Sequence, residues 1–261
     1  MPYLNFVSFE LGPLTIYTWG LTAALGFLVS LGIAARQTKK RGLNTDFLYS
    51  LFLWIIIGSM IGARIFHVLF YNWPYFSQHL WEILNIRDGG LSSYGGFFGG
   101  LLAAFWFSRK HRANFLAYAN LLAYSFPFGW VLGRLGCALI NDHPGKLTNF
   151  FLGVKYPDGL RHDLGLEEML LTLVLAVIFL LITKLPLPLR ERVGVRGEGF
   201  YLIFLGLWYG LTRFFLDFLR VEDARLAGLT PAQYFSLVLV AVSLAMLWRK
   251  TKIHLVRPLN N

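Results

Sequence analysis

Long apolar stretches recur along this chain of 261 residues, and no other feature constrains its fold as strongly. A hydrocarbon core about 30 Å thick is crossed by roughly 20 helical residues. Hydrophobic residues make up 56% of the sequence and its mean hydropathy is +0.55. We therefore expect an all-α polytopic membrane protein, folded as a single domain over residues 1–261. Seven stretches have the required length: 15–34, 47–71, 91–107, 114–140, 167–184, 199–219 and 231–248.

The third stretch is the weakest of the seven because four glycines, at positions 95, 96, 99 and 100, lower its helix propensity. Small residues at this spacing favour close contact between helices in lipid. The segment 141–166 is too polar and too broken by Pro and Gly to span, and 72–90 carries aromatic residues suited to the headgroup layer. We expect both segments to form a small external head.

The basic residues indicate the orientation of the chain. The net charge is +10, and the cations fall in short connections between apolar stretches, which argues against a nucleic-acid binder with one basic face. Alternate connections are rich in them: Arg36, Lys39, Lys40 and Arg41; Arg109, Lys110 and Arg112; Lys184, Arg190, Arg192 and Arg196; Arg249, Lys250, Lys252 and Arg257. Because cytoplasmic loops carry an excess of Lys and Arg, we expect an external N-terminus and a cytoplasmic C-terminus.

Three arginines interrupt the apolar stretches, and a charge inside a bilayer is costly to insert. With this orientation, Arg64, Arg134 and Arg213 lie at a similar depth, about 10 Å below the external ends of their helices. Guanidinium groups suit phosphate because they donate paired hydrogen bonds and stay charged. The sequence therefore predicts a shared anion pocket in the outer leaflet, to which other polar residues contribute: Ser92, Tyr94, Glu168, Tyr209, Asp217 and Arg220.

Other interpretations of these residues remain open. Tyr209, Arg213 and Asp217 follow one another at a spacing of four, so they could form an intrahelical polar ladder that only fixes helix packing. A small-anion transporter is a second alternative, but it should carry polar residues through both halves of its spans, and here they concentrate in one half.

Four segments in order resemble the bacterial prolipoprotein diacylglyceryl transferase family. The segments are GGLSSYGG (89–96), FGWVLGRLG (128–136), YGLTRFFLDFLR (209–220) and LTPAQYFS (229–236). The resemblance covers nearly the whole chain. It implies an enzyme of the bacterial cytoplasmic membrane that moves the diacylglyceryl group of phosphatidylglycerol to the lipobox cysteine of a preprolipoprotein, releasing glycerol phosphate. The active site would face the outer leaflet.

The resemblance also implies roles for individual residues. Arg134 matches the family's signature arginine and would bind the phosphate of phosphatidylglycerol, while Arg213 and Tyr209 match a second essential arginine and a functional tyrosine. Further matches, expected to contact phosphatidylglycerol, are Arg64, Ser92, Glu168, Asp217 and Arg220.

The chain departs from the family pattern at several of these positions. Tyr94 replaces a histidine proposed to help deprotonate the thiol, and a phenol with a pKa of about 10 is a poor base at neutral pH. His143 and Asp142, just after the fourth stretch, are replacement candidates, and Asp142 stands where many members carry Glu. If no base has been retained, the alternative is a phospholipid-binding or lipid-transport paralogue.

A single cysteine, Cys137, excludes a disulfide within the chain and a metal site built from several cysteines. In the resembling family the reacting thiol belongs to the substrate, so we interpret Cys137 as a small apolar residue. His143 and His162 with Asp142 and Asp163 match no helical metal motif. We therefore expect no metal and no cofactor, and a monomer whose partners are phosphatidylglycerol, the preprolipoprotein and the bilayer, without nucleic acid.

Overall fold

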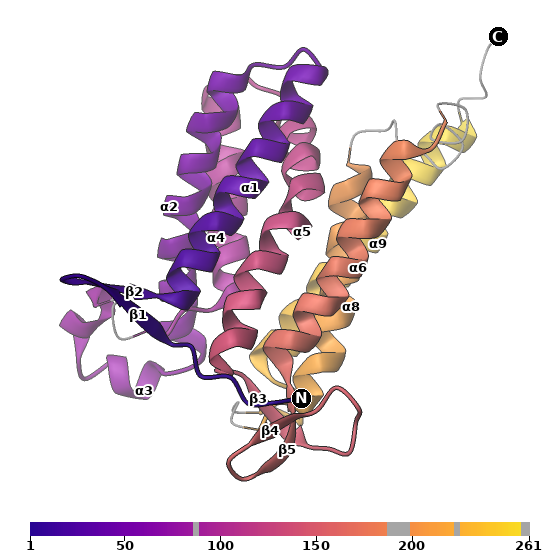
Figure 1. Cartoon of the computed structure of the whole chain (residues 1–261). Coiled ribbons are helices and arrows are strands. Elements are labelled where there is room, and N and C mark those ends of the chain that lie inside the picture. The colour runs from indigo at the N-terminus through magenta and orange to yellow at the C-terminus, as the bar shows by residue number, and fades with distance from the viewer. Residues whose placement is uncertain (86–88, 187–198, 222–224, 257–261) are drawn as a thin grey trace.

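The computed structural model describes residues 1–85, 89–186, 199–221 and 225–256, without the side chains of 251–256 (Figure 1). Most of the described chain is helical, as predicted. The long helices are α1 (Thr18–Lys40), α2 (Thr45–Phe70), α4 (Ser93–Lys110), α5 (Phe115–Ile140), α6 (Leu164–Lys184), α8 (Phe200–Leu216) and α9 (Pro231–Val256). Short helical turns are α3 (Trp73–Phe76), η1 (Leu80–Leu84) and η2 (Asp217–Leu219). The predicted basic residues Arg190, Arg192, Arg196 and Arg257 lie outside the described residues.

Polar side chains placed just before the apolar stretches begin several of these helices. The side chains of Asn44, Ser92, Asn114 and Asp163 each accept a hydrogen bond from a backbone N–H in the first turn of α2, α4, α5 and α6. Such capping satisfies donors that a helix cannot pair within itself. Capping residues readable in the sequence therefore explain where four of the helices begin.

Six of the described helices are long and apolar enough to cross a membrane: α1, α2, α5, α6, α9 and the run Phe200–Leu219 that contains α8. The seventh predicted span, 91–107, does form a helix, but α4 is not among the six. It has only 18 residues, with polar Ser93 and Tyr94 at one end, Arg109 and Lys110 at the other, and four glycines in between. The chain therefore has the character of a polytopic membrane protein, and its described residues contain six candidate spans and one glycine-rich companion helix.

The helices form two groups joined by α5. Helix α4 packs along α2, α1 packs along α5, and α8 packs along α9, while α5 also contacts α6 and α8 (Figure 1). Glycines permit the closest approaches. A Cβ atom at Gly62 would lie 2.3 Å from the carbonyl oxygen of Gly95, and one at Gly26 would lie 2.5 Å from that of Gly129. The glycines that weaken α4 as an isolated helix thus allow it to pack against α2.

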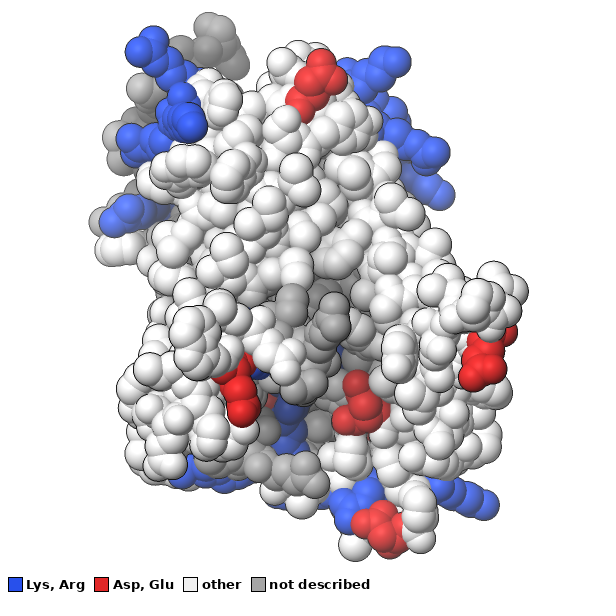
Figure 2. All heavy atoms as spheres, turned by 90° about the vertical axis from the view of Figure 1, so that its left-hand side faces the viewer, with Lys and Arg blue, Asp and Glu red and all other residues white. Residues whose placement is uncertain are grey.

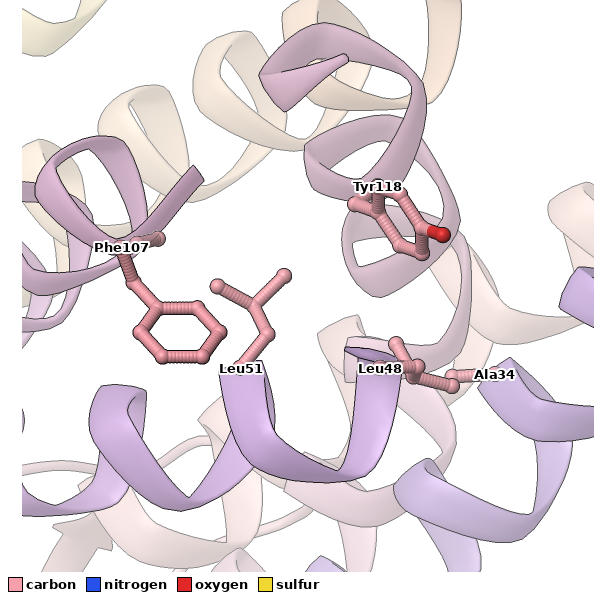
Figure 3. Packing of buried hydrophobic residues seen from close by; sticks show 6 residues of the cluster. Ala34, Leu48, Leu51, Phe107 and Tyr118 are labelled. Atoms are coloured by element: carbon pink, nitrogen blue, oxygen red, sulfur yellow. The ribbon is translucent and has the colours of Figure 1, made fainter. Parts of the chain in front are cut away.

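Buried apolar clusters lie in both groups. One consists of Ala34, Leu48, Leu51, Ala104, Phe107 and Tyr118, contributed by α1, α2, α4 and α5 (Figure 3). Another consists of Ala123, Tyr124, Leu175, Phe179 and Tyr201, from α5, α6 and α8. Many large apolar side chains stay exposed, and Figure 2 shows an uncharged band below an end of the molecule where Lys and Arg gather. This surface suits contact with lipid.

Two small antiparallel sheets were not predicted. Strands β1 (Ser8–Leu11) and β2 (Leu14–Tyr17) form a hairpin, so the first predicted span began three residues too early. Strands β3 (Pro144–Leu147), β4 (Val154–Tyr156) and β5 (Gly159–Asp163) form a sheet in the order β3-β5-β4, within the segment that we expected to be a non-spanning head. The all-α prediction is therefore wrong for these short segments.

Asp163 fastens this head to the helices. Its Oδ2 accepts hydrogen bonds from Tyr156 Oη and Asn141 Nδ2, both at 2.7 Å, and its Oδ1 accepts one from the backbone of Leu166, also at 2.7 Å. Asn141 ends α5 with a left-handed backbone, φ +49°. The sheet is thus held against the end of α5 and the start of α6, where Arg134 and Glu168 lie.

Candidate active site

Glu168, in the second turn of α6, joins three helices through its buried carboxylate. Its Oε2 lies 2.9 Å from Arg134 Nη2 on α5 and 3.2 Å from Arg213 Nη1 on α8. Its Oε1 accepts a hydrogen bond of 2.9 Å from Trp130 Nε1, one helical turn before Arg134. The Glu168 side chain is 4% exposed, and both arginine side chains are below 10%. The predicted convergence of Arg134 and Arg213 is therefore confirmed.

Both arginines keep a free donor in this buried position. Neither Nε has a hydrogen-bond partner among the described residues. Arg134 also stacks over the Trp130 ring, with 5.0 Å between its Cζ and the ring centroid, and its Nη1 lies 3.7 Å from Cys137 Sγ. Buried polar groups are usually paired, so an unpaired N–H group on each of two arginines that share Glu168 indicates a place for an acceptor.

A second carboxylate, on Asp217, holds the other side of Arg213. Its Oδ1 lies 3.3 Å from Arg213 Nη2 and 3.0 Å from Arg220 Nε, and its Oδ2 accepts a hydrogen bond from the Thr230 hydroxyl. Asp217 is fully buried. The arrangement includes the predicted spacing of four residues between Arg213 and Asp217, but it reaches beyond one helix to the residue before α9.

The ion-pair cluster is rich in arginine. The cluster has three cations, Arg134, Arg213 and Arg220, against two carboxylates, Glu168 and Asp217. Two of the cations, Arg134 and Arg213, share one carboxylate oxygen, and among the described residues their Nε–H groups have no acceptor. A phosphodiester is an anion with several acceptor oxygens, and it suits the free N–H groups of these two arginines.

Two tyrosines form an aromatic wall beside the cluster. The rings of Tyr94 and Tyr209 meet edge to face, with 5.9 Å between their centroids, and both residues are buried. The Tyr94 hydroxyl exchanges a hydrogen bond with Ser236 on α9. The Tyr209 hydroxyl, although near Ser93, makes no hydrogen bond of normal geometry with the described residues. Tyr94 is thus held by a neighbour, whereas Tyr209 keeps its donor available.

Asp142 and His143 lie beyond the end of α5 and pair with each other. Asp142 Oδ1 contacts His143 Nδ1, and the His143 carbonyl accepts a hydrogen bond of 3.0 Å from the backbone of Leu164, the first residue of α6. Ligand atoms of Cys137, Asp142 and His143 all lie within 4.8 Å of one another. A carboxylate that orients an imidazole is the usual arrangement around a general base. The side chains are 37% and 25% exposed, which leaves them accessible.

The same three residues could in principle hold a metal ion, but their surroundings disfavour one. Arg134 Nη1 lies 3.7 Å from Cys137 Sγ, which places a fixed positive charge beside the only sulfur. A cation bound there would be repelled at close range. The His162 side chain contacts Glu167 at 2.5 Å, and Asp163 is occupied in the head, so the four-residue cluster considered from the sequence is divided among other interactions.

Arg64 does not join this site, and the expectation that three arginines share one pocket is wrong for it. Its guanidinium donates to five backbone carbonyls at 2.6 to 3.2 Å, those of Glu82, Ile83, Asn85, Gly89 and Gly90. Its Cζ also lies 4.9 Å from the centroid of the Phe76 ring. All five N–H groups are used, so Arg64 organises the connection between α2 and α4. The membrane depth estimated from the sequence does not indicate which groups Arg64 contacts.

Ser92 acts locally as well. Its hydroxyl accepts a hydrogen bond of 3.3 Å from the backbone of Gly95, and its own N–H donates to the carbonyl of Ala63 at 3.0 Å. It therefore begins α4 and fastens it to α2. Its contact with a lipid remains a prediction.

Three supporting residues were missed from the sequence. Trp130 bonds Glu168, Thr230 bonds Asp217, and Ser236 bonds Tyr94. Two of them lie in the segment LTPAQYFS, in which Gln233 also bonds the carbonyl of Phe214 at 3.1 Å. Hydroxyl and amide side chains at the start of an apolar helix could have marked these residues as candidates from the sequence. They would not have indicated which groups they bond.

Comparison with known proteins agrees with these observations. The sequence model of the family described as "Prolipoprotein diacylglyceryl transferase" matches residues 6–249. Proteins named phosphatidylglycerol--prolipoprotein diacylglyceryl transferase are similar to the chain in Bacillus velezensis (31% identity, 95% of this chain and 93% of the relative) and in Lysinibacillus sphaericus (30% identity, 96% and 94%). One from Clostridium perfringens, named with the suffix 1, is 29% identical over 92% of each chain. The chain belongs to the prolipoprotein diacylglyceryl transferase family.

Proposed function

We propose that this protein transfers the diacylglyceryl group of phosphatidylglycerol to the lipobox cysteine thiol of a preprolipoprotein. Relatives about 30% identical over nearly the full length are named for these two substrates, phosphatidylglycerol and the prolipoprotein. The observation that carries the proposal on the structural side is the pair of buried arginines held by Glu168, whose two Nε–H groups have no acceptor among the described residues. Because these relatives are named as transferases, they do not support the alternative of a paralogue that only binds lipid.

In this reaction the thiolate sulfur attacks the carbon of the diacylglyceryl unit that is bonded to the phosphate oxygen. The bond between that carbon and that oxygen breaks as the thioether forms. The departing glycerol phosphate takes the bonding electron pair, so the phosphate charge grows from about −1 to −2. Arg134 and Arg213 are fixed beside one another by Glu168 and would stabilise that growing charge most strongly in the transition state. Tyr209 would donate its free hydroxyl to the same phosphate.

The thiol proton needs an acceptor, and we assign it to His143, oriented by Asp142. Tyr94 is a poorer choice because its hydroxyl is bonded to Ser236 within the protein. The Cys137 thiol is buried beside Arg134 and belongs to the packing of α5. Asp217 joins Arg213 to Arg220, and Glu168 acts by positioning Arg134 and Arg213.

We further propose that the ion-pair cluster faces the outer leaflet of the bacterial cytoplasmic membrane, with the N-terminus external. The cluster lies at the end where α1 and α6 begin, whereas Arg36 and Lys40 lie where α1 ends. An excess of cations at the opposite end is typical of the cytoplasmic side. The segments 72–90 and 141–166 would then be external, and a monomer contains the complete cluster.

Transfer can be measured with purified protein, phosphatidylglycerol and a lipobox peptide, using mass spectrometry of the peptide as the readout. We expect the thioether product with the unaltered chain, and loss of product by about 100-fold or more with Arg134→Ala or Arg213→Ala. Arg109→Ala removes a cation at the other end and serves as the control. Phosphatidylglycerol binding without any product would contradict the proposal.

A further inference from the structure

A groove lies between α1, α5 and α6, far from the Glu168 cluster. It has a volume of about 330 Å³ and is lined by Ile33, Arg36, Gln37, Lys40, Tyr124, Phe128 and Leu180. Leu180 follows Glu168 by three helical turns on α6, which is roughly 18 Å along the helix. The groove therefore lies at the opposite end of the helices, away from the residues proposed above to contact the two substrates.

The lining of the groove has two chemically different parts. Ile33, Phe128 and Leu180 supply an apolar wall from three helices, while Arg36 and Lys40 stand one helical turn apart at the end of α1. A smaller hollow that shares Gln37 and Tyr124 adds a third cation, Arg41. The three cations are exposed. Within the part of the chain that the structure describes, no acidic residue lines either hollow and none of the three cations makes an ion pair.

We propose that this groove binds one anionic phospholipid from the leaflet opposite to the Glu168 cluster. The lipid phosphate would lie between Arg36 and Lys40, and an acyl chain would run along Ile33, Phe128 and Leu180. This inference goes beyond the transferase reaction, since the lipid bound here is not a substrate. Its binding would stabilise the contact of α1 and α5 with α6.

Charge complementarity selects a lipid over other occupants. Arg36 and Lys40 lie in the last two turns of a helix that is long and apolar enough to span a membrane, which is the level of the lipid headgroups. Cations at this level attract anionic lipids, and the apolar wall below them offers no hydrogen-bond partner for a polar peptide backbone. A phospholipid satisfies both parts of the lining at once.

The lipid can be detected at the groove itself. The full chain carries a photoreactive benzophenone amino acid at position 180 and is placed in nanodiscs of phosphatidylglycerol and phosphatidylcholine. After irradiation, mass spectrometry identifies the lipid joined to the protein. We expect phosphatidylglycerol to be enriched in the adduct about fivefold over its share of the bilayer. Because the crosslink forms far from Glu168, the result is independent of whether transfer is observed.

Two groove variants and one control variant test the cationic and the apolar parts of the groove separately. Arg36→Gln with Lys40→Gln should abolish the enrichment, whereas Arg109→Gln with Lys110→Gln, which removes two cations from the end of α4, should leave it unchanged. Ile33→Trp, which fills the groove and keeps both cations, should reduce the total lipid adduct. Adducts that only follow the bilayer composition, equal enrichment in the two double variants, or crosslinks to the protein chain alone would each overturn the proposal.

Discussion

Arg134 and Arg213, on α5 and α8, bind the same carboxylate oxygen, Oε2 of Glu168, at 2.9 and 3.2 Å. Two guanidinium groups that would otherwise repel each other are thereby held together, and neither Nε has a partner in the described parts of the chain. A transition state that gains negative charge at this place meets donors that need no reorganisation. The position of these two arginines therefore depends on a third helix, α6.

The role of Glu168 can be tested with Glu168→Gln. Removing one partner from buried ion pairs leaves uncompensated charge, which costs about 3–5 kcal/mol in folding free energy. We expect a lower unfolding temperature together with a strong loss of transfer. Glu167→Gln removes the same charge one residue away, where the side chain is 12% exposed and pairs with His162, and it should cost less. Equal effects of the two variants on unfolding would contradict the assignment of Glu168.

The identity of the base can be tested by comparing His143→Gln with Tyr94→Phe. If His143 removes the thiol proton, His143→Gln should lower the transfer rate by about 100-fold, and raising the pH should restore part of it as the substrate thiol, with a pKa of about 8.5, ionises unaided. Tyr94→Phe should cost less than about tenfold, since it removes the hydrogen bond to Ser236 and keeps the ring. A larger loss for Tyr94→Phe, without rescue at high pH, would make Tyr94 the reacting group.

The structural role assigned to Arg64 predicts a phenotype unlike that of Arg134. Arg64→Lys cannot reproduce five hydrogen bonds to backbone carbonyls, so the connection before α4 should open more readily. Hydrogen exchange over residues 82–85 and 89–90 should rise, while the KM for phosphatidylglycerol changes little. The lipid-binding role expected from the sequence would instead appear as a raised KM with unchanged exchange.

The stability of the head, which contains β3, β4 and β5, should decline at alkaline pH. Burial, followed by the hydrogen bond to Asp163, raises the pKa of Tyr156 above its usual value. The unfolded chain therefore loses this proton first, so the stabilisation is complete below a pH of about 10 and declines above it. Tyr156→Phe should lower head stability at neutral pH and remove this part of the alkaline decline. Limited proteolysis between positions 144 and 163 across pH 8 to 11 measures both, and an unchanged alkaline decline would contradict the cause.

Membrane character, most helix positions and the grouping of Arg134 with Arg213 follow from the sequence alone. Apolar length and charge placement are local properties, and capping residues such as Asn44 and Asn114 begin helices through hydrogen bonds within one turn. The family resemblance, carried by ordered segments, likewise needs no coordinates. The hairpin and the head sheet were missed because their strands are only three to five residues long.

Only the tertiary structure decided which polar groups meet. Arg64 and Arg134 occupy similar depths in their helices, yet one binds loop carbonyls and the other binds Glu168. Depth follows from the helical rise, but the direction of a side chain depends on how its helix is rotated against its neighbours. That rotation is set by packing between residues distant in sequence, such as Gly62 with Gly95. The pattern of residues within a single helix therefore does not determine it.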